Sequence, residues 1–155
     1  MRALLLCFTF VLLLPSLCIP DVPLKEVGKD QIFSAEPEWK VRYDAFQPRP
    51  ESIQQLKPLV GNNLRVDVYL GLWCPDSRNN VPRFMKIVDR LEIPISVRYF
   101  SVERKQGKDI RYYFEKANVE RVPTFIFFRG DQEIGRIVEN PEKGLTEDMI
   151  AILQR

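Results

Sequence analysis

The segment 64–91 constrains the fold most, because its apolar pattern changes from that of a strand to that of a helix within a few residues. Residues 64–72 are mostly apolar, which is typical of a buried strand, and after Cys74 the apolar side chains recur at helical spacing. Pro75 suits the first turn of that helix, and Pro82 within it predicts a kink. A strand that leads directly into a helix is the first half of a parallel crossover, so we predict an α/β chain.

Further strands and helices are predicted on both sides of this segment. The strands are expected at 93–102, 124–128 and 133–138, with a hairpin turn at 129–132, and the helices near 50–60, at 109–117 and at 144–153 with Thr146 as N-cap. A hairpin adds antiparallel strands to the sheet that the crossover begins. We therefore expect one α/β domain with a central mixed sheet of about four to five strands and helices on both faces.

The N-terminal residues have the pattern of a secretory signal peptide, which we place at 1–18. Arg2 precedes an apolar run at 3–14, and this run is shorter than the roughly 20 residues that a membrane-spanning helix needs. The expected product is exported, to the bacterial periplasm or alternatively secreted or membrane-tethered, and has no transmembrane helix. An uncleaved anchor and a lipidated Cys18 are the other interpretations of this segment.

The domain proper is expected to begin at residue 51. Residues 19–50 are rich in proline and only weakly periodic, so we predict an extended lead-in, with at most one short helix or strand near 38–46. The remainder, 51–155, has the length of a single domain with one core.

Composition excludes several classes of function. The chain has 23 basic and 21 acidic residues, and this near-neutral balance offers no concentrated positive charge for a nucleic-acid partner. Histidine is absent, which excludes Ser-His-Asp and Cys-His catalysis and every histidine-based zinc site. No metal-ligand spacing and no glycine-rich phosphate loop occur, so we expect neither a bound metal nor a resident cofactor.

Cysteine is the informative residue type. Of the three cysteines, Cys7 and Cys18 lie in the presumed signal peptide, so the exported chain keeps only Cys74 and cannot form an internal disulfide. A lone cysteine is either buried and inert or exposed and reactive. At the first turn of a helix Cys74 would meet the positive end of the helix dipole, with Arg78 adding attraction for a thiolate and Asp76 opposing it. We expect the exposed, reactive case.

These residues resemble the thioredoxin family over about 64–153. The resemblance rests on a strand that leads into the motif Trp73-Cys74-Pro75-Asp76-Ser77, on Pro82 eight residues after Cys74, and on Val122-Pro123-Thr124 at the start of a later strand. It implies a thioredoxin fold with Cys74 as nucleophile and a cis Val122–Pro123 bond facing it. By the same resemblance, the Val122 backbone would pair with an extended substrate and Trp73 would be a partly exposed platform. Ordinary alternatives are a trans proline and a core tryptophan.

Two departures from the family pattern limit the expected chemistry. Ser77 stands where thioredoxins carry their second cysteine, so it would only donate a hydrogen bond to the Cys74 thiolate or cap the helix. The buried acid of many thioredoxins is Val68 here, and Asp67 lies one residue earlier, on the opposite side of the strand. We expect Asp67 to point away from the site, as a solvated or helix-facing structural acid.

The sequence therefore predicts a monothiol protein that exchanges disulfides with protein or peptide partners as a monomer. Attack by Cys74 would stop at a mixed disulfide until an external thiol such as glutathione resolves it. One alternative is a thioredoxin-fold binding module with reduced catalysis. Another is peroxide reduction through a sulfenic acid, which is weaker because Gly71 stands where such sites carry a threonine. Arg78, Arg83 and Arg121 would either flank the site together or form a solvated basic surface.

Overall fold

A computed structural model describes residues 25–102 and 117–155. The predicted signal peptide at 1–18 and all but the last residue of the helix predicted at 109–117 lie outside the described residues. The strands are β1 (Lys25–Val27), β2 (Leu64–Leu70), β3 (Ser96–Ser101), β4 (Thr124–Arg129) and β5 (Gln132–Val138). The helices are α1 (Lys29–Ala35), α2 (Pro37–Ala45), α3 (Pro50–Leu56), the 3-10 helix η1 (Lys57–Leu59), α4 (Pro75–Leu91) and α6 (Leu145–Leu153).

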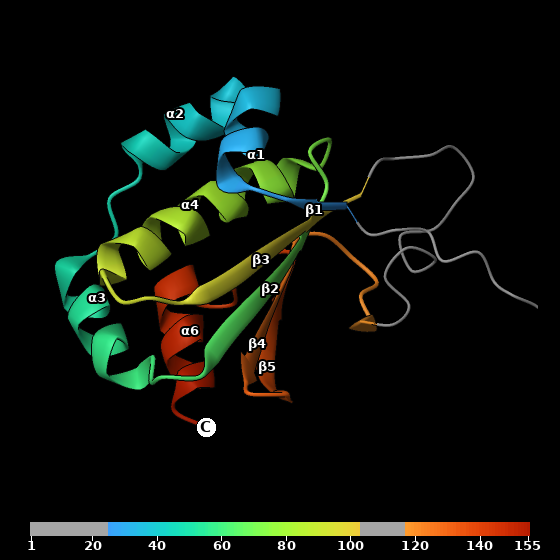
Figure 1. The fold of residues 1–155 in the computed structure, drawn as a ribbon. Coiled ribbons are helices and arrows are strands. Elements are labelled where there is room, and N and C mark those ends of the chain that lie inside the picture. Colours follow the sequence, from blue (N-terminus) through green and yellow to red (C-terminus); the bar gives the residue numbers. More distant parts are fainter. Residues whose placement is uncertain (1–24, 103–116) are drawn as a thin grey trace, which may run out of the picture.

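The strands form one mixed sheet in the order β1-β3-β2-β4-β5 (Figure 1). The central strands β2 and β3 are parallel and are connected through α4, as the apolar pattern of 64–91 predicts. The remaining neighbours are antiparallel, and the β4–β5 hairpin adds two strands on the far side of β2. The predicted α/β class and mixed sheet are confirmed.

The main core lies between one face of this sheet and the helices. On β2 the side chains alternate, so that Val66, Val68 and Leu70 face α4 and α6 while Tyr69 faces the opposite way. Phe84 of α4 packs against Phe125 of β4, with ring centroids 5.0 Å apart. The described helices all contribute residues to this one core. Figure 1 shows them gathered around α4 and α6.

The predicted extended lead-in at 19–50 is wrong for its described part, because this part contains β1, α1 and α2. Helix α2 does lie where one short helix or strand was expected, near 38–46. The prolines do not interrupt these helices: Pro37 is the first residue of α2 and Pro50 is the first residue of α3, where a proline costs no hydrogen bond. The helical pattern was weak because α1 and α2 each bury a single side chain, Ile32 and Trp39. A helix held by one anchor has no apolar stripe to detect.

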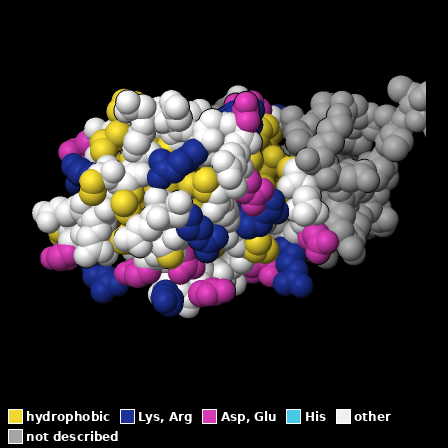
Figure 2. Space-filling model, turned by 90° about the horizontal axis from the view of Figure 1, so that it is seen from below, with side chains coloured by type: hydrophobic (Ala, Val, Ile, Leu, Met, Phe, Trp, Pro, Cys, Tyr) yellow, Lys and Arg dark blue, Asp and Glu magenta, His cyan; other side chains and the backbone are white. Residues whose placement is uncertain are grey.

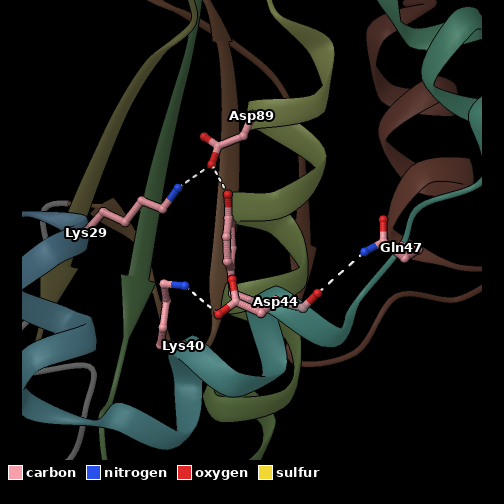
Figure 3. Close-up of polar contacts among 6 residues, drawn as sticks. Lys29, Lys40, Asp44, Gln47 and Asp89 are labelled. Carbon is pink, nitrogen blue, oxygen red and sulfur yellow. Dashed lines mark hydrogen bonds and ion pairs between the residues drawn. The ribbon is translucent and has the colours of Figure 1, made fainter.

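Polar contacts join the two N-terminal helices to α4. Asp89 of α4 accepts hydrogen bonds from Lys29 of α1 and from Tyr43 of α2, and Figure 3 shows Lys29 reaching the Asp89 carboxylate. Burial lowers the pKa of Lys29, but its hydrogen bond and charge attraction with Asp89 outweigh this and raise the pKa overall. The N-terminal helices therefore form an outer layer on α4 and belong to the domain.

The last helix begins at Leu145, with Gly144 as its N-cap, so the prediction of Thr146 as N-cap is wrong. The Thr146 hydroxyl instead donates to the Glu147 carboxylate at 2.8 Å. Within the described ranges, no helix is long and apolar enough to cross a membrane. On the face drawn in Figure 2, basic and acidic side chains are interspersed among apolar ones, with no block of one sign.

Candidate active site

Cys74 lies where strand β2 has ended and helix α4 begins. It is the N-cap of α4, its N–H donates to the Gly71 carbonyl at 2.9 Å, and its carbonyl accepts from the Arg78 N–H at 3.0 Å. Pro75 occupies the first helical position, as predicted, and lacks the donor that would otherwise be unpaired there. The cysteine is thus held at the positive end of a 17-residue helix.

The thiol of Cys74 faces the loop that precedes β4. Its Sγ donates to the Val122 carbonyl oxygen at 3.1 Å, and the Val122–Pro123 peptide bond is cis, as the resemblance implies. A carbonyl only accepts hydrogen bonds, so this contact belongs to the protonated thiol. A thiolate has no proton to donate and would not form this hydrogen bond.

The expectation that Cys74 is exposed is wrong, since the residue is only 6% exposed. It packs in a second apolar cluster, on the sheet face that points away from the described helices, together with Tyr69, Val122 and other buried residues. The neighbouring Trp73 is 38% exposed, and its indole N–H donates to the Val102 carbonyl at 3.1 Å. The platform interpretation of Trp73 therefore agrees with the structure and core packing does not.

Ser77 has neither of the roles predicted for it. Its side chain is fully buried, and its hydroxyl oxygen accepts a hydrogen bond from the Gly71 N–H at 3.3 Å. Among the described residues it makes no hydrogen bond to Cys74. Because Ser77 lies one turn into the helix, its hydroxyl turns back toward the end of β2 and braces the segment 71–74.

The acid near the site is placed differently from the prediction. Val68 is fully buried among the helices, whereas Asp67 is on the sheet face that also carries Tyr69, a neighbour of Cys74 in the second cluster. Asp67 is neither solvated nor helix-facing: it is 3% exposed and accepts two hydrogen bonds from the Arg98 guanidinium, at 2.8 and 2.6 Å. A carboxylate held in this bidentate pair is structural and has no described contact with Cys74.

The three arginines proposed to flank the site are not brought together. Arg78 lies 3.5 Å from the Glu38 carboxylate of α2, and Arg121 donates to Glu139 at 2.8 Å. Arg83 stacks on the Phe46 ring, 5.6 Å from its centroid. Each cation therefore has a local partner of its own, which favours the interpretation of a solvated surface. The described residues include no cluster of acidic and cysteine side chains that could hold a metal ion.

Sequence reasoning missed a group of polar side chains beside the motif. Asn80, on the inner side of α4, is 2% exposed, and its amide donates to the Glu139 carbonyl and to the Asn140 side chain, both at 2.9 Å. The Asn140 amide in turn donates to Asp76 at 3.3 Å. The signal was available, because an asparagine next to Val81 and four residues before Phe84 interrupts the buried face of an amphipathic helix.

Comparison with known proteins identifies the family of this chain. The family model for thioredoxin matches residues 32–151, and the chain therefore belongs to the thioredoxin family. The match includes α2, which the sequence analysis had placed outside the domain. No curated protein matches the sequence.

Solved structures support the fold in the same way. A protein of unknown function from Pseudomonas aeruginosa is similar with a TM-score of 0.57 and 17% identity, over 82% of this chain and 86% of that chain. An HIV epitope scaffold has the same TM-score and identity, over 82% of this chain and 87% of its own. At such low identity the likeness concerns the fold alone.

Proposed function

We propose that this protein exchanges disulfides through a single nucleophilic cysteine, Cys74. The observation that carries the proposal is the position of the Cys74 thiol at the start of α4, 3.1 Å from the carbonyl oxygen of Val122 and next to cis Pro123. Membership of the thioredoxin family supports it. The helix N-terminus favours a negative sulfur, and we propose that the backbone of Val122, which is buried in the structure, becomes available to pair with an extended peptide when the Cys74 thiol leaves it.

The exchange has two balanced steps. The Cys74 thiol first gives its proton to solvent, and the resulting thiolate attacks one sulfur of a substrate disulfide. A new Cys74–substrate S–S bond forms while the old bond breaks, and the other substrate sulfur leaves as a thiolate. A second thiolate, from the substrate or from a small thiol of the glutathione class, then attacks the substrate sulfur of the mixed disulfide and releases the Cys74 thiolate.

The external thiol is required because Ser77 cannot supply it. In the structure the Ser77 hydroxyl is buried against the Gly71 backbone, so no second group in the motif competes for the mixed disulfide. The proposed activity is therefore isomerisation or thiol exchange on protein or peptide partners, by a monomer with no resident cofactor. We further propose an exported location, the bacterial periplasm first, where disulfides persist.

A second candidate function is a binding module that keeps the substrate groove and has lost turnover. The observation in its favour is the low exposure of Cys74, 6%, with its thiol occupied by the Val122 carbonyl. In this case the partly exposed Trp73 and the backbone of Val122 would hold an extended peptide without covalent chemistry.

Incubation of the full chain with oxidised glutathione, followed by peptide mapping in a mass spectrometer, tests the first proposal. We expect a glutathione adduct on the Cys74 peptide in incubations at neutral and mildly alkaline pH. The Cys74→Ser variant is the matched control and should carry no adduct at this position. Absence of any adduct on Cys74 in the folded protein over that pH range would rule out exchange.

Peptide binding by the Cys74→Ala variant separates the two candidates. A binding module should hold an extended peptide equally well with or without the sulfur, as measured by the change in Trp73 emission on titration. The exchange protein should instead lose covalent capture of a disulfide-containing peptide completely in this variant.

A further inference from the structure

We propose that Asn80 is a positioning residue for the candidate active site: it fastens the cis-proline loop to α4 and so sets the distance between the Cys74 thiol and the Val122 carbonyl. The inference rests on the proposed function only where it concerns disulfide exchange. Its structural part rests on a network of hydrogen bonds between α4 and two loop segments far from it in the sequence. We call this network the circuit, and its members are Asp76, Asn80, Arg121, Pro123, Glu139 and Asn140.

The first half of the circuit leaves α4. Asn80 lies four residues after Asp76, so the two side chains are on the same face of the helix, one turn apart. The Asn140 amide bridges them: its nitrogen donates to Asp76 at 3.3 Å, and its oxygen accepts from Asn80 at 2.9 Å. Both protons of the Asn80 amide are used, because the second one goes to the Glu139 carbonyl at 2.9 Å.

The second half of the circuit reaches the loop through Glu139. The Glu139 N–H donates to the Pro123 carbonyl at 2.7 Å, and its carboxylate accepts from Arg121 at 2.8 Å. These contacts hold the residues on both sides of Val122, whose own carbonyl receives the Cys74 thiol. Glu139 also has a positive φ of 58°, a conformation that a non-glycine residue keeps only when its surroundings hold it there.

The circuit depends on Asn80 more than on any other side chain, because Asn80 alone among the described residues joins α4 to both Glu139 and Asn140. Its side chain is only 2% exposed and donates the hydrogen bonds from α4 to both Glu139 and Asn140. Without its amide, the Glu139 carbonyl loses its side-chain donor, and the thiol contact and the weaker hydrogen bond from Asn140 to Asp76 remain between this region and α4. The expected consequence is a loop that opens locally, with a more accessible Cys74 and a less well placed Val122 backbone.

Two rates measured on the Cys74 peptide of the full chain test this inference. One is alkylation by iodoacetamide, which requires access to the thiol alone, and the other is mixed-disulfide formation with an extended peptide disulfide, which requires the placed loop as well. In Asn80→Ala we expect alkylation to rise about tenfold and the ratio of exchange to alkylation to fall about tenfold, the factor that corresponds to a lost network hydrogen bond.

The chain offers a matched control in Asn79→Ala. Asn79 is the preceding residue on the same helix and is half-buried, and its side chain makes no hydrogen bond among the described residues. This variant should leave both rates at the values of the unchanged protein. Equal rates in Asn80→Ala and Asn79→Ala would overturn the inference.

Global destabilisation is separated from local opening by repeating the alkylation in low concentrations of urea. Local opening exposes little surface, so the rate in Asn80→Ala should be almost independent of urea, and a steep increase would overturn the inference. If Asn80→Ala does not fold, Asn140→Ala at an exposed position removes one arm of the circuit and should shift both rates in the same directions, by a smaller factor.

The experiments can rule out the proposed function while the positioning role of Asn80 is retained, and the reverse. If the unchanged protein forms no mixed disulfide but Asn80→Ala still alkylates faster than Asn79→Ala, exchange is ruled out and the positioning role of Asn80 is retained. If exchange occurs but neither variant changes it or the alkylation rate, the function is retained and the positioning role is ruled out.

Discussion

At the scale of single residues, the position of Gly71, shortly before the motif, leaves no room for a side chain. A Cβ atom at Gly71 would lie 2.8 Å from the Trp73 ring, closer than real Cβ contacts. The same glycine uses both of its backbone groups in the site, since its N–H donates to Ser77 and its carbonyl accepts from Cys74. The position that argued against a peroxidase-type threonine therefore has a steric reason to be glycine.

The substitution Gly71→Ala should displace the Trp73 indole outward. The added methyl group meets a rigid ring, and moving this ring breaks the hydrogen bond from its N–H to the Val102 carbonyl. We expect a loss of about 1–3 kcal/mol in the free energy of unfolding. Iodide should also quench the tryptophan emission more strongly than in the unchanged protein.

A suitable control is Gly28→Ala, where the nearest atom to an added Cβ is 3.9 Å away, an ordinary contact. It should leave iodide quenching unchanged. If Gly71→Ala also leaves quenching and stability unchanged, the close packing between residues 71 and 73 does not hold in solution.

At the scale of elements, α2 is attached to the domain by one large side chain. Trp39 is fully buried in the main core, although its indole N–H has no hydrogen-bond partner there, whereas Val41 on the same helix is 66% exposed. Apolar burial must therefore provide the attachment, with the Asp89 contacts of Lys29 and Tyr43 adding orientation.

We expect Trp39→Ala to lower the free energy of unfolding by about 3–5 kcal/mol, the usual cost of emptying an aromatic core position. Val41→Ala is the matched control and should change it by less than about 0.5 kcal/mol. Urea unfolding followed by circular dichroism measures both. Equal stability of the two variants would mean that α1 and α2 unfold independently of the sheet.

The elements also differ in how far the sequence predicts them. Segment 64–91 is predicted well, because β2 and α4 each bury a continuous face and therefore carry a clear period. Helix α1 is missed and α2 is predicted only as a short helix or strand, because a helix with a single fully buried side chain has a sequence much like that of a solvated loop. The proline signal misleads in the same region, since Pro37 and Pro50 open helices there.

At the scale of the whole molecule, a carboxylate near the C-terminus is joined to the N-terminal half. Glu147 of α6 accepts from Arg49, which directly precedes α3, and from the Thr146 hydroxyl. Burial raises the pKa of Glu147, but the hydrogen bonds from Thr146 and from its own backbone, with the attraction of Arg49, lower it below the ordinary 4.5.

This lowered pKa of Glu147 predicts that the free energy of unfolding decreases as the pH falls into the acid range. A carboxylate whose pKa is lower in the folded than in the unfolded protein contributes stability above pH 4.5, and the contribution is lost as the pH falls through the folded value. Glu147→Gln should therefore reduce stability at neutral pH and make it less dependent on pH in the acid range. Urea midpoints measured between neutral and acid pH provide the test.

Asp131→Asn, in the exposed β4–β5 turn, serves as the control for removing one negative charge. It should leave the acid dependence of the midpoint in place. If the urea midpoint falls equally steeply with decreasing pH in Glu147→Gln and in the unchanged protein, the contact with Arg49 contributes nothing to this pH dependence.

The local parts of this protein can be predicted from its sequence: a buried strand, a helix opened by Cys74 and Pro75, and a later strand opened by Pro123. These depend on residue periodicity and on the backbone preferences of proline, which act over a few neighbouring residues. The resemblance carried by the same residues led to the thioredoxin fold and to Cys74 as the candidate nucleophile.

The surroundings of the Cys74 thiol depend on the tertiary structure and cannot be predicted from the sequence. The Val122 carbonyl that receives the Cys74 thiol lies 48 residues further along the chain, and Glu139, which holds the loop, is 59 residues from Asn80. Hydrogen-bond partners and burial at such separations arise from the way the sheet and helices pack. No local pattern records them, because the side chains involved meet only after the chain has folded.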